Sequence, residues 1–138
     1  KGHIDRLKVY ELLMYHDLVE IEVGDTPLIP GKELKNKKEK ELHAAKKIKE
    51  RLPNQLQEKY FNLFLEFENQ KTREAKLARI VDVLDSDIHE LDYKGDWKDW
   101  TKDYYLSKRN FLFKDFPELK KIFKDILGYL KEQGYFKV

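Results

Sequence analysis

Apolar side chains recur every three or four positions along most of the chain, which is the period of an α-helix. This spacing predicts helices over residues 5–23, 32–52, 56–70, 73–91 and 119–133, and a helix with less distinct ends over 104–113. Asp5, Gly24, Pro53, Thr72 and Gly134 are the residues that we expect to begin or end helices. No segment alternates apolar and polar residues as a half-buried strand does. The pattern therefore predicts an all-α fold, a single helical bundle of about five to six helices over residues 1–138.

The composition and charge of the chain limit the classes of molecule that we expect it to bind. The chain of 138 residues has 28 basic and 26 acidic side chains and a formal net charge of +2, so no global positive field favours nucleic acid. Because there are no cysteines, we expect neither disulfides nor a thiolate metal site, which suits a cytoplasmic protein. No apolar run approaches the roughly 18 residues of a membrane span, so we expect no membrane partner.

Several candidate metal ligands lie in the stretch YHDLVEIEVGDTP, residues 15–27. On a helix, His16 and Glu20 share a face, and Asp17 and Glu20 lie one turn apart. Imidazole and carboxylate donors suit Zn, Mn, Fe, Co or Ni, and Asp25 follows close enough to reach the same place. The simpler alternatives are that His16 is a helix-end histidine bonded to its neighbour and that Asp25 is a turn residue.

A further candidate ligand, Asp82, lies at the edge of an apolar helix stripe. A carboxylate in that position costs free energy unless a cation or a donor pairs with it. The site hypothesis gives it a metal ion, and the alternative pairs it with Arg79 or Lys76. We expect its neighbours Asp85 and Asp87 at the surface.

Three other features have simpler structural interpretations. The run KNKKEKELHAAKK, residues 35–47, predicts a solvated helix face, because its interleaved glutamates argue against a nucleic-acid stripe. His43 and His89 are expected at the surface, and Trp97 and Trp100 as hydrophobic plugs. A set of apolar residues near the C-terminus predicts a core seam, with a homodimer contact as the alternative: Phe111, Phe113, Phe116, Ile122, Phe123, Leu127 and Leu130.

The stretch LLMYHDLVEIEVGDTP, with AKLARIVDVLD further along, resembles the HD-domain metal-dependent phosphohydrolases. It is most similar to the small branch that contains bacterial deoxynucleoside 5′-monophosphate phosphatases and HD domain-containing protein 2. His-Asp alone carries no weight, but the added Glu, Gly-Asp-x-Pro and distant Asp make the pattern specific. The resemblance covers Ile4 to Leu91, and it implies a single HD-type domain.

The resemblance implies a role for each candidate residue. His16, Asp17 and Asp82 would be metal ligands, with Co, Mn, Zn, Mg, Fe or Ni as the divalent ion. Glu20 would orient or deprotonate the attacking water, and Asp25 would line the nucleotide site near the sugar and phosphate. The implied activity is that of a metal-dependent phosphoric monoester hydrolase, 5′-nucleotidase-like, whose partner is a small (deoxy)nucleoside 5′-monophosphate.

The chain departs from the family's pattern at its start. The family's first metal-ligand histidine lies on an earlier helix, and His3 is not assigned to that role. We expect N-terminal helices that carry this histidine to precede Lys1. Two alternatives remain open: hydrolysis of another nucleotide (a triphosphate, a cyclic nucleotide or a guanosine polyphosphate), and an HD-fold binding module without turnover.

Overall fold

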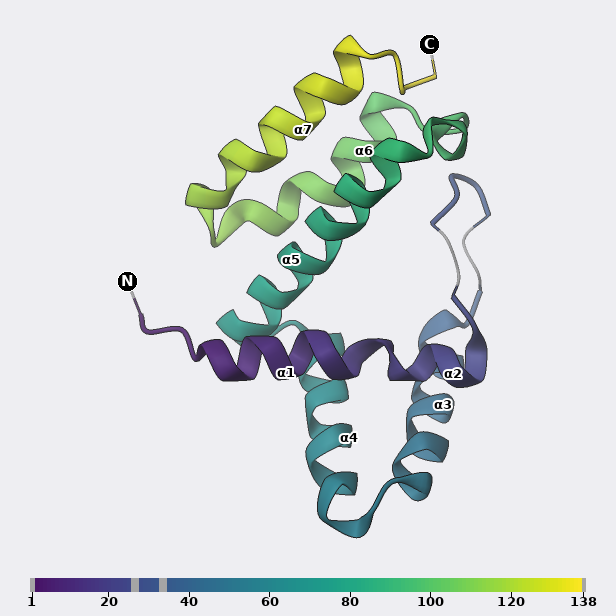
Figure 1. Ribbon diagram of the computed structural model, residues 1–138, viewed down its shortest axis with the longest axis vertical. Helices are drawn as coiled ribbons and strands as arrows, with labels where there is room; N and C mark the ends of the chain where they lie inside the picture. Colours follow the sequence, from purple (N-terminus) through teal and green to yellow (C-terminus); the bar gives the residue numbers. More distant parts are fainter. Residues whose placement is uncertain (1, 26–27, 33–34, 138) are drawn as a thin grey trace. The chain divides into compact units, whose positions relative to one another are not determined.

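The protein is built from helices, as the computed structural model shows (Figure 1). The structure describes residues 2–25, 28–32 and 35–137, and no strand occurs in these ranges. The all-α prediction is therefore confirmed. None of the helices in the described ranges is long and apolar enough to cross a membrane. The chain divides into two compact units, unit 1 (Lys1–Pro27 and Leu34–Arg79) and unit 2 (Leu28–Glu33 and Ile80–Val138).

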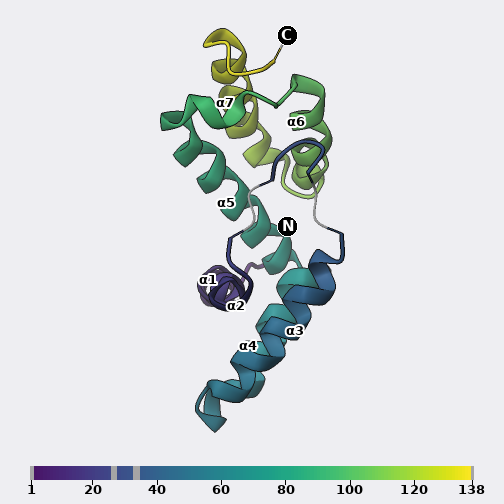
Figure 2. The ribbon, with the colours of Figure 1, turned by 90° about the vertical axis from the view of Figure 1, so that its right-hand side faces the viewer.

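Unit 1 contains the N-terminal helices and a helical hairpin. In it, α3 and α4 lie side by side, α1 packs across α4, and α2 packs against α3 (Figure 2). Its elements are α1 (Arg6–His16), the 3-10 turn η1 (Asp17–Val19), α2 (Glu20–Val23), α3 (Lys37–Arg51), α4 (Asn54–Asn69) and the first turns of α5 (Arg73–His89).

The helix predicted over residues 5–23 is divided into α1, η1 and α2. Asp5 is its N-cap as predicted, and its side chain accepts a hydrogen bond of 3.1 Å from the backbone N–H of Lys8. Gly24 ends α2, also as predicted, with a φ of 74° that a residue with a Cβ rarely adopts. The chain tightens into 3-10 geometry at Asp17, one residue after α1 ends at His16.

Two clusters of buried side chains hold unit 1 together. In one, Val9 and Leu12 of α1 pack with residues of α4 and α5. In the other, residues of η1, α3 and α4 meet. The predicted cap Thr72 is confirmed, since its hydroxyl accepts a 3.2 Å hydrogen bond from the N–H of Ala75. Helix α3 begins at Lys37, later than residue 32, because Asn36 has a left-handed φ of 64°.

Unit 2 contains the rest of α5, the 3-10 turns η2 (Glu90–Asp92) and η3 (Lys94–Trp97), α6 (Lys102–Arg109), η4 (Asn110–Lys114), η5 (Pro117–Leu119) and α7 (Lys120–Glu132). Trp97 and Trp100 are buried, which confirms their prediction as hydrophobic plugs. Phe113 and Phe123 stack with ring centroids 4.8 Å apart. The predicted core seam is therefore largely confirmed, but Phe111 and Ile122 are exposed.

One prediction for α5 is wrong, because Asp87 is buried with only 3% of its surface exposed. Arg109 and Tyr105 of α6 bond to its carboxylate at 3.0 and 2.8 Å. A carboxylate is tolerated in a core when such partners pair with it. These partners lie on another helix, so the sequence of α5 alone could not reveal them. Asp85 is exposed as predicted.

Candidate metal centre

His16 lies at the last position of α1, and its imidazole ring is held from two sides. The ring packs on Phe67 of α4 with centroids 4.2 Å apart, and 10% of the side chain is exposed. Nδ1 lies 2.8 Å from the carbonyl oxygen of Leu13, one turn earlier. Because a carbonyl oxygen can only accept, Nδ1 is an N–H donor in that contact, and Nε2 is the ring nitrogen left for another partner.

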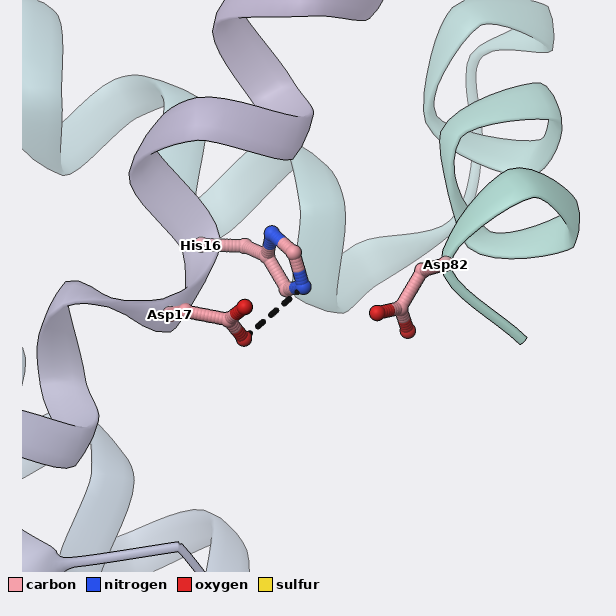
Figure 3. A group of neighbouring side chains, drawn as sticks. All are labelled: His16, Asp17 and Asp82. Carbon is pink, nitrogen blue, oxygen red and sulfur yellow. Dashed lines mark ion pairs between the residues drawn. The ribbon is translucent and has the colours of Figure 1, made fainter. Parts of the chain in front are cut away.

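Asp17, the next residue, brings a carboxylate to the same nitrogen. Its Oδ1 lies 2.9 Å from His16 Nε2, although neighbouring helix residues diverge by about 100° around the axis (Figure 3). The Asp17 side chain is 61% exposed, so solvent and a small ligand can reach it. The two side chains therefore converge at a surface-accessible point.

Asp82 completes the group from α5. Ligand atoms of His16, Asp17 and Asp82 all lie within 4.8 Å of one another, and Figure 3 shows the Asp82 carboxylate pointing toward the other two side chains. The first turns of α5 belong to unit 1, where Ala75 and Ala78 are fully buried. Because α5 is continuous, this packing places Asp82 within one turn beyond Arg79.

The donor set fits a divalent cation. One imidazole nitrogen and two carboxylate oxygens are borderline-to-hard ligands suited to Mn, Fe, Co, Ni or Zn. The hydrogen bond from Nδ1 to a carbonyl is the usual second contact of a metal-binding histidine, because it fixes the ring and its tautomer.

Glu20 begins α2, about one turn after Asp17, and lies outside the group of three. Partial burial raises the pKa of its carboxyl above the usual value, and the charges of Asp17 and Asp25 raise it further. His16 and Lys37 act in the opposite direction. A carboxylate with a raised pKa is a stronger base, which favours its accepting a proton from water.

Asp25 follows Gly24 and is exposed. It lies near enough to Glu20 to influence its pKa, but its own carboxylate is not among the converging donors. Thr26 and Pro27, the remainder of the Gly-Asp-x-Pro pattern, lie outside the described residues. The structure thus brings His16, Asp17 and Asp82 together and keeps the two other acids nearby.

Two contributors to the centre were not identified from the sequence. Phe67 was not expected to take part in the centre, yet its ring supports His16 and also lies 4.3 Å from the guanidinium of Arg79. The carbonyl of Leu13 is a backbone group and carries no sequence signal. The α-helical spacing of three between Leu13 and His16 is the one hint that the sequence offered.

A solved structure shares the whole fold. The crystal structure of a predicted metal-dependent phosphohydrolase from Magnetospirillum magnetotacticum matches with a TM-score of 0.81 and 24% sequence identity. The match covers 100% of this chain and 70% of that chain. At this identity, the likeness concerns the fold alone.

Curated relatives are similar over a shorter stretch. 5′-deoxynucleotidase HDDC2 from Bos taurus is 27% identical over 92 residues, which is 67% of this chain and 45% of the relative. The Homo sapiens protein of the same name is 33% identical over 93 residues, or 65% of this chain and 46% of its own length. The matched stretch thus spans less than half the length of these relatives.

The comparison with protein families extends further along the chain. The HD domain family matches residues 1–124, which include His16, Asp17 and Asp82. The structure is all-α, and it brings together the adjacent histidine and aspartate with an aspartate from a later helix. The chain belongs to the HD domain family.

Proposed function

We propose that this protein is a metal-dependent phosphohydrolase that removes the phosphate group from (deoxy)nucleoside 5′-monophosphates. The observation that carries the proposal is the convergence of His16, Asp17 and Asp82, whose ligand atoms lie within 4.8 Å of one another. The name 5′-deoxynucleotidase of the curated relatives supports the substrate class.

His16, Asp17 and Asp82 would hold the ion. Nε2 of His16, which pairs with Asp17 Oδ1 at 2.9 Å, would turn to the ion in place of that contact. When bound by these residues, a divalent cation would neutralise phosphate oxygens and would lower the pKa of bound water. Phe67 keeps the imidazole ring in place by stacking on it. The exposed edge at Asp17 leaves room for the phosphate group of a substrate.

Glu20 is the proposed general base, with one carboxylate oxygen accepting the proton that the attacking water loses. Its raised pKa makes it a stronger base for that transfer. Asp25, exposed beside Glu20, is the proposed substrate-binding acid. Its carboxylate would accept a hydrogen bond from a sugar hydroxyl and so orient the nucleotide.

The test is phosphate release from a panel of ribo- and deoxyribonucleoside 5′-monophosphates with added Co, Mn, Mg or Zn. We expect release that needs a metal and is absent in His16→Ala. Glu20→Gln should keep metal binding but lower turnover by about two orders of magnitude or more, as loss of a general base does. Glu39→Gln is the matched control, because Glu39 is exposed on α3 and outside the converging group.

The panel also separates the alternatives. Faster cleavage of a triphosphate, a cyclic nucleotide or a guanosine polyphosphate would reject the monophosphate assignment. A folded protein that binds nucleotide and metal but releases no phosphate with any ion would instead be a binding module. Undiminished turnover in Glu20→Gln would remove Glu20 from the mechanism.

A further inference from the structure

Unit 1 contains a cavity of about 260 Å³ where α2 packs against α3. None of the converging donors His16, Asp17 and Asp82 lines it. On the α2 side, the cavity is lined by Glu22 and Val23, the last two residues of the short helix that begins at Glu20. The lining residues are Glu22, Val23, Lys40, His43, Ala44 and Lys47.

The wall on α3 is a single helix face. Lys40, His43 and Lys47 are spaced by three and four residues, so their side chains follow one another on successive turns. Ala44 lies between them and is 2% exposed, which makes it a small apolar floor. The basic run that the sequence predicted to be a solvated face therefore places three of its side chains around one hollow.

The charged side chains that line the cavity leave an excess of positive charge. The acid of the lining, Glu22, forms an ion pair with Arg51 at the end of α3, so its charge is already matched. Two other lysines of the same helix are also matched, Lys37 by Glu41 and Lys49 by Glu58. Across the described ranges of the chain, no ion pair or hydrogen bond is made by the side chains of Lys40, His43 or Lys47.

We propose that this cavity binds the phosphate group of a small phosphorylated molecule. Two ammonium groups and an imidazole N–H supply charge-assisted donors from one side, which suits a tetrahedral oxyanion. The ester part of the ligand would lie against Val23 and Ala44. A nucleic-acid strand fits poorly, because Glu39 and Glu41 interrupt the basic residues of α3.

The proposal goes beyond the phosphohydrolase activity and does not depend on it, so it is tested on protein stripped of metal with a chelator. Inorganic phosphate and glycerol 3-phosphate are titrated at constant ionic strength while amide and histidine-ring resonances are recorded by NMR. We expect saturable shifts of the His43 ring and of amides around it on α3. Tighter binding of the ester would support a phosphorylated molecule as the ligand, and tighter binding of inorganic phosphate would overturn that assignment.

The variants use matched pairs of lysines on the same helix. Lys40→Gln with Lys47→Gln should weaken binding by at least about tenfold, the effect of losing one charge-assisted hydrogen bond. Lys38→Gln with Lys46→Gln removes the same charge from exposed positions that do not line the cavity, and should change the dissociation constant less than twofold. Circular dichroism of both variants checks that α3 still forms.

Equal weakening in the two double variants would overturn the proposal, because binding would then follow net charge alone. Absence of saturable shifts around His43 in the unmodified protein would overturn it as well. Neither result bears on nucleotide turnover, which is measured separately with metal and with the His16→Ala control. If the unmodified protein shows the phosphate-dependent resonance shifts at α3 but no nucleotide turnover with any metal, only the hydrolase proposal is refuted.

Discussion

Replacing Arg109 by methionine would leave the carboxylate of Asp87 buried without its cation. In the native chain, Arg109 Nη2 lies 3.0 Å from Asp87 Oδ1, and Nε lies 3.2 Å from Oδ2. The two side chains are 11% and 3% exposed. Methionine retains much of the apolar stem of Arg109. It removes the guanidinium group, whose central carbon also lies 5.8 Å from the ring centroid of Trp100 and 5.9 Å from that of Tyr105.

The expected loss follows from this burial. Removing one partner of a buried ion pair costs about 3–5 kcal/mol, whereas an exposed pair contributes about 0–1 kcal/mol. The Tyr105 hydroxyl still donates to Asp87 at 2.8 Å, so we expect the lower end of the range, about 3 kcal/mol. Folded domains are stable by only about 5–15 kcal/mol, so this loss is a large part of the total.

Equilibrium urea unfolding, monitored by tryptophan fluorescence, measures the loss of stability in the unit that contains the ion pair. The chain has 2 tryptophans, and both, Trp97 and Trp100, lie in unit 2 with the ion pair. Lys102→Met is the control, because Lys102 is an exposed residue of α6, and its loss should change stability by less than about 0.5 kcal/mol.

A second variant tests the electrostatic reasoning. Asp87→Leu combined with Arg109→Met removes both charges, and replacing a buried pair by apolar residues is often close to neutral. The double variant should therefore be more stable than Arg109→Met alone. A loss below about 1 kcal/mol in Arg109→Met, or a double variant less stable than the single one, would refute the reasoning.

Three further predictions concern unit 1 and the metal centre. Asp82→Asn should weaken Mn or Co binding, measured by calorimetry, by at least about tenfold, while Asp85→Asn on the exposed side of α5 should not. Because the folded chain raises the pKa of Glu20, ionised Glu20 lowers stability once the pH exceeds both its folded and unfolded pKa values. Glu20→Gln should therefore raise the thermal midpoint of the metal-free protein at neutral pH, and the difference should disappear below the usual pKa of glutamate. The Tyr60 hydroxyl is buried without a hydrogen-bond partner in the described ranges, so Tyr60→Phe should keep or raise stability, by up to about 1 kcal/mol in urea unfolding.

Metal affinity provides the sharpest of these comparisons. Asp82 and Asp85 carry the same charge on the same helix less than one turn apart, so a general electrostatic effect would change binding alike in both variants. Equal affinities for the Asp82 and Asp85 variants would therefore remove Asp82 from the proposed ligand set. A lower midpoint for Glu20→Gln at neutral pH would contradict the raised pKa.

The amino-acid sequence by itself determined the helices and most of their ends. The cap at Asp5, the cap at Thr72 and the break at Gly24 all lie where the sequence predicts them. These features depend on hydrogen bonds and backbone angles within about one turn of chain, so nearby residues contain the necessary information. The contact between His16 and Asp17, which the sequence offered as one of two alternatives, is likewise local, since the two residues are neighbours in the chain.

The tertiary structure alone decided which polar groups meet. Nothing local in α5 distinguishes Asp87, whose partner Arg109 lies on α6, from its exposed neighbour Asp85. The basic run of α3 became a candidate anion site only because α2 packs against it and Arg51 neutralises Glu22. Burial and charge pairing depend on segments that are distant in the chain, and helical periodicity carries no record of which segments these will be.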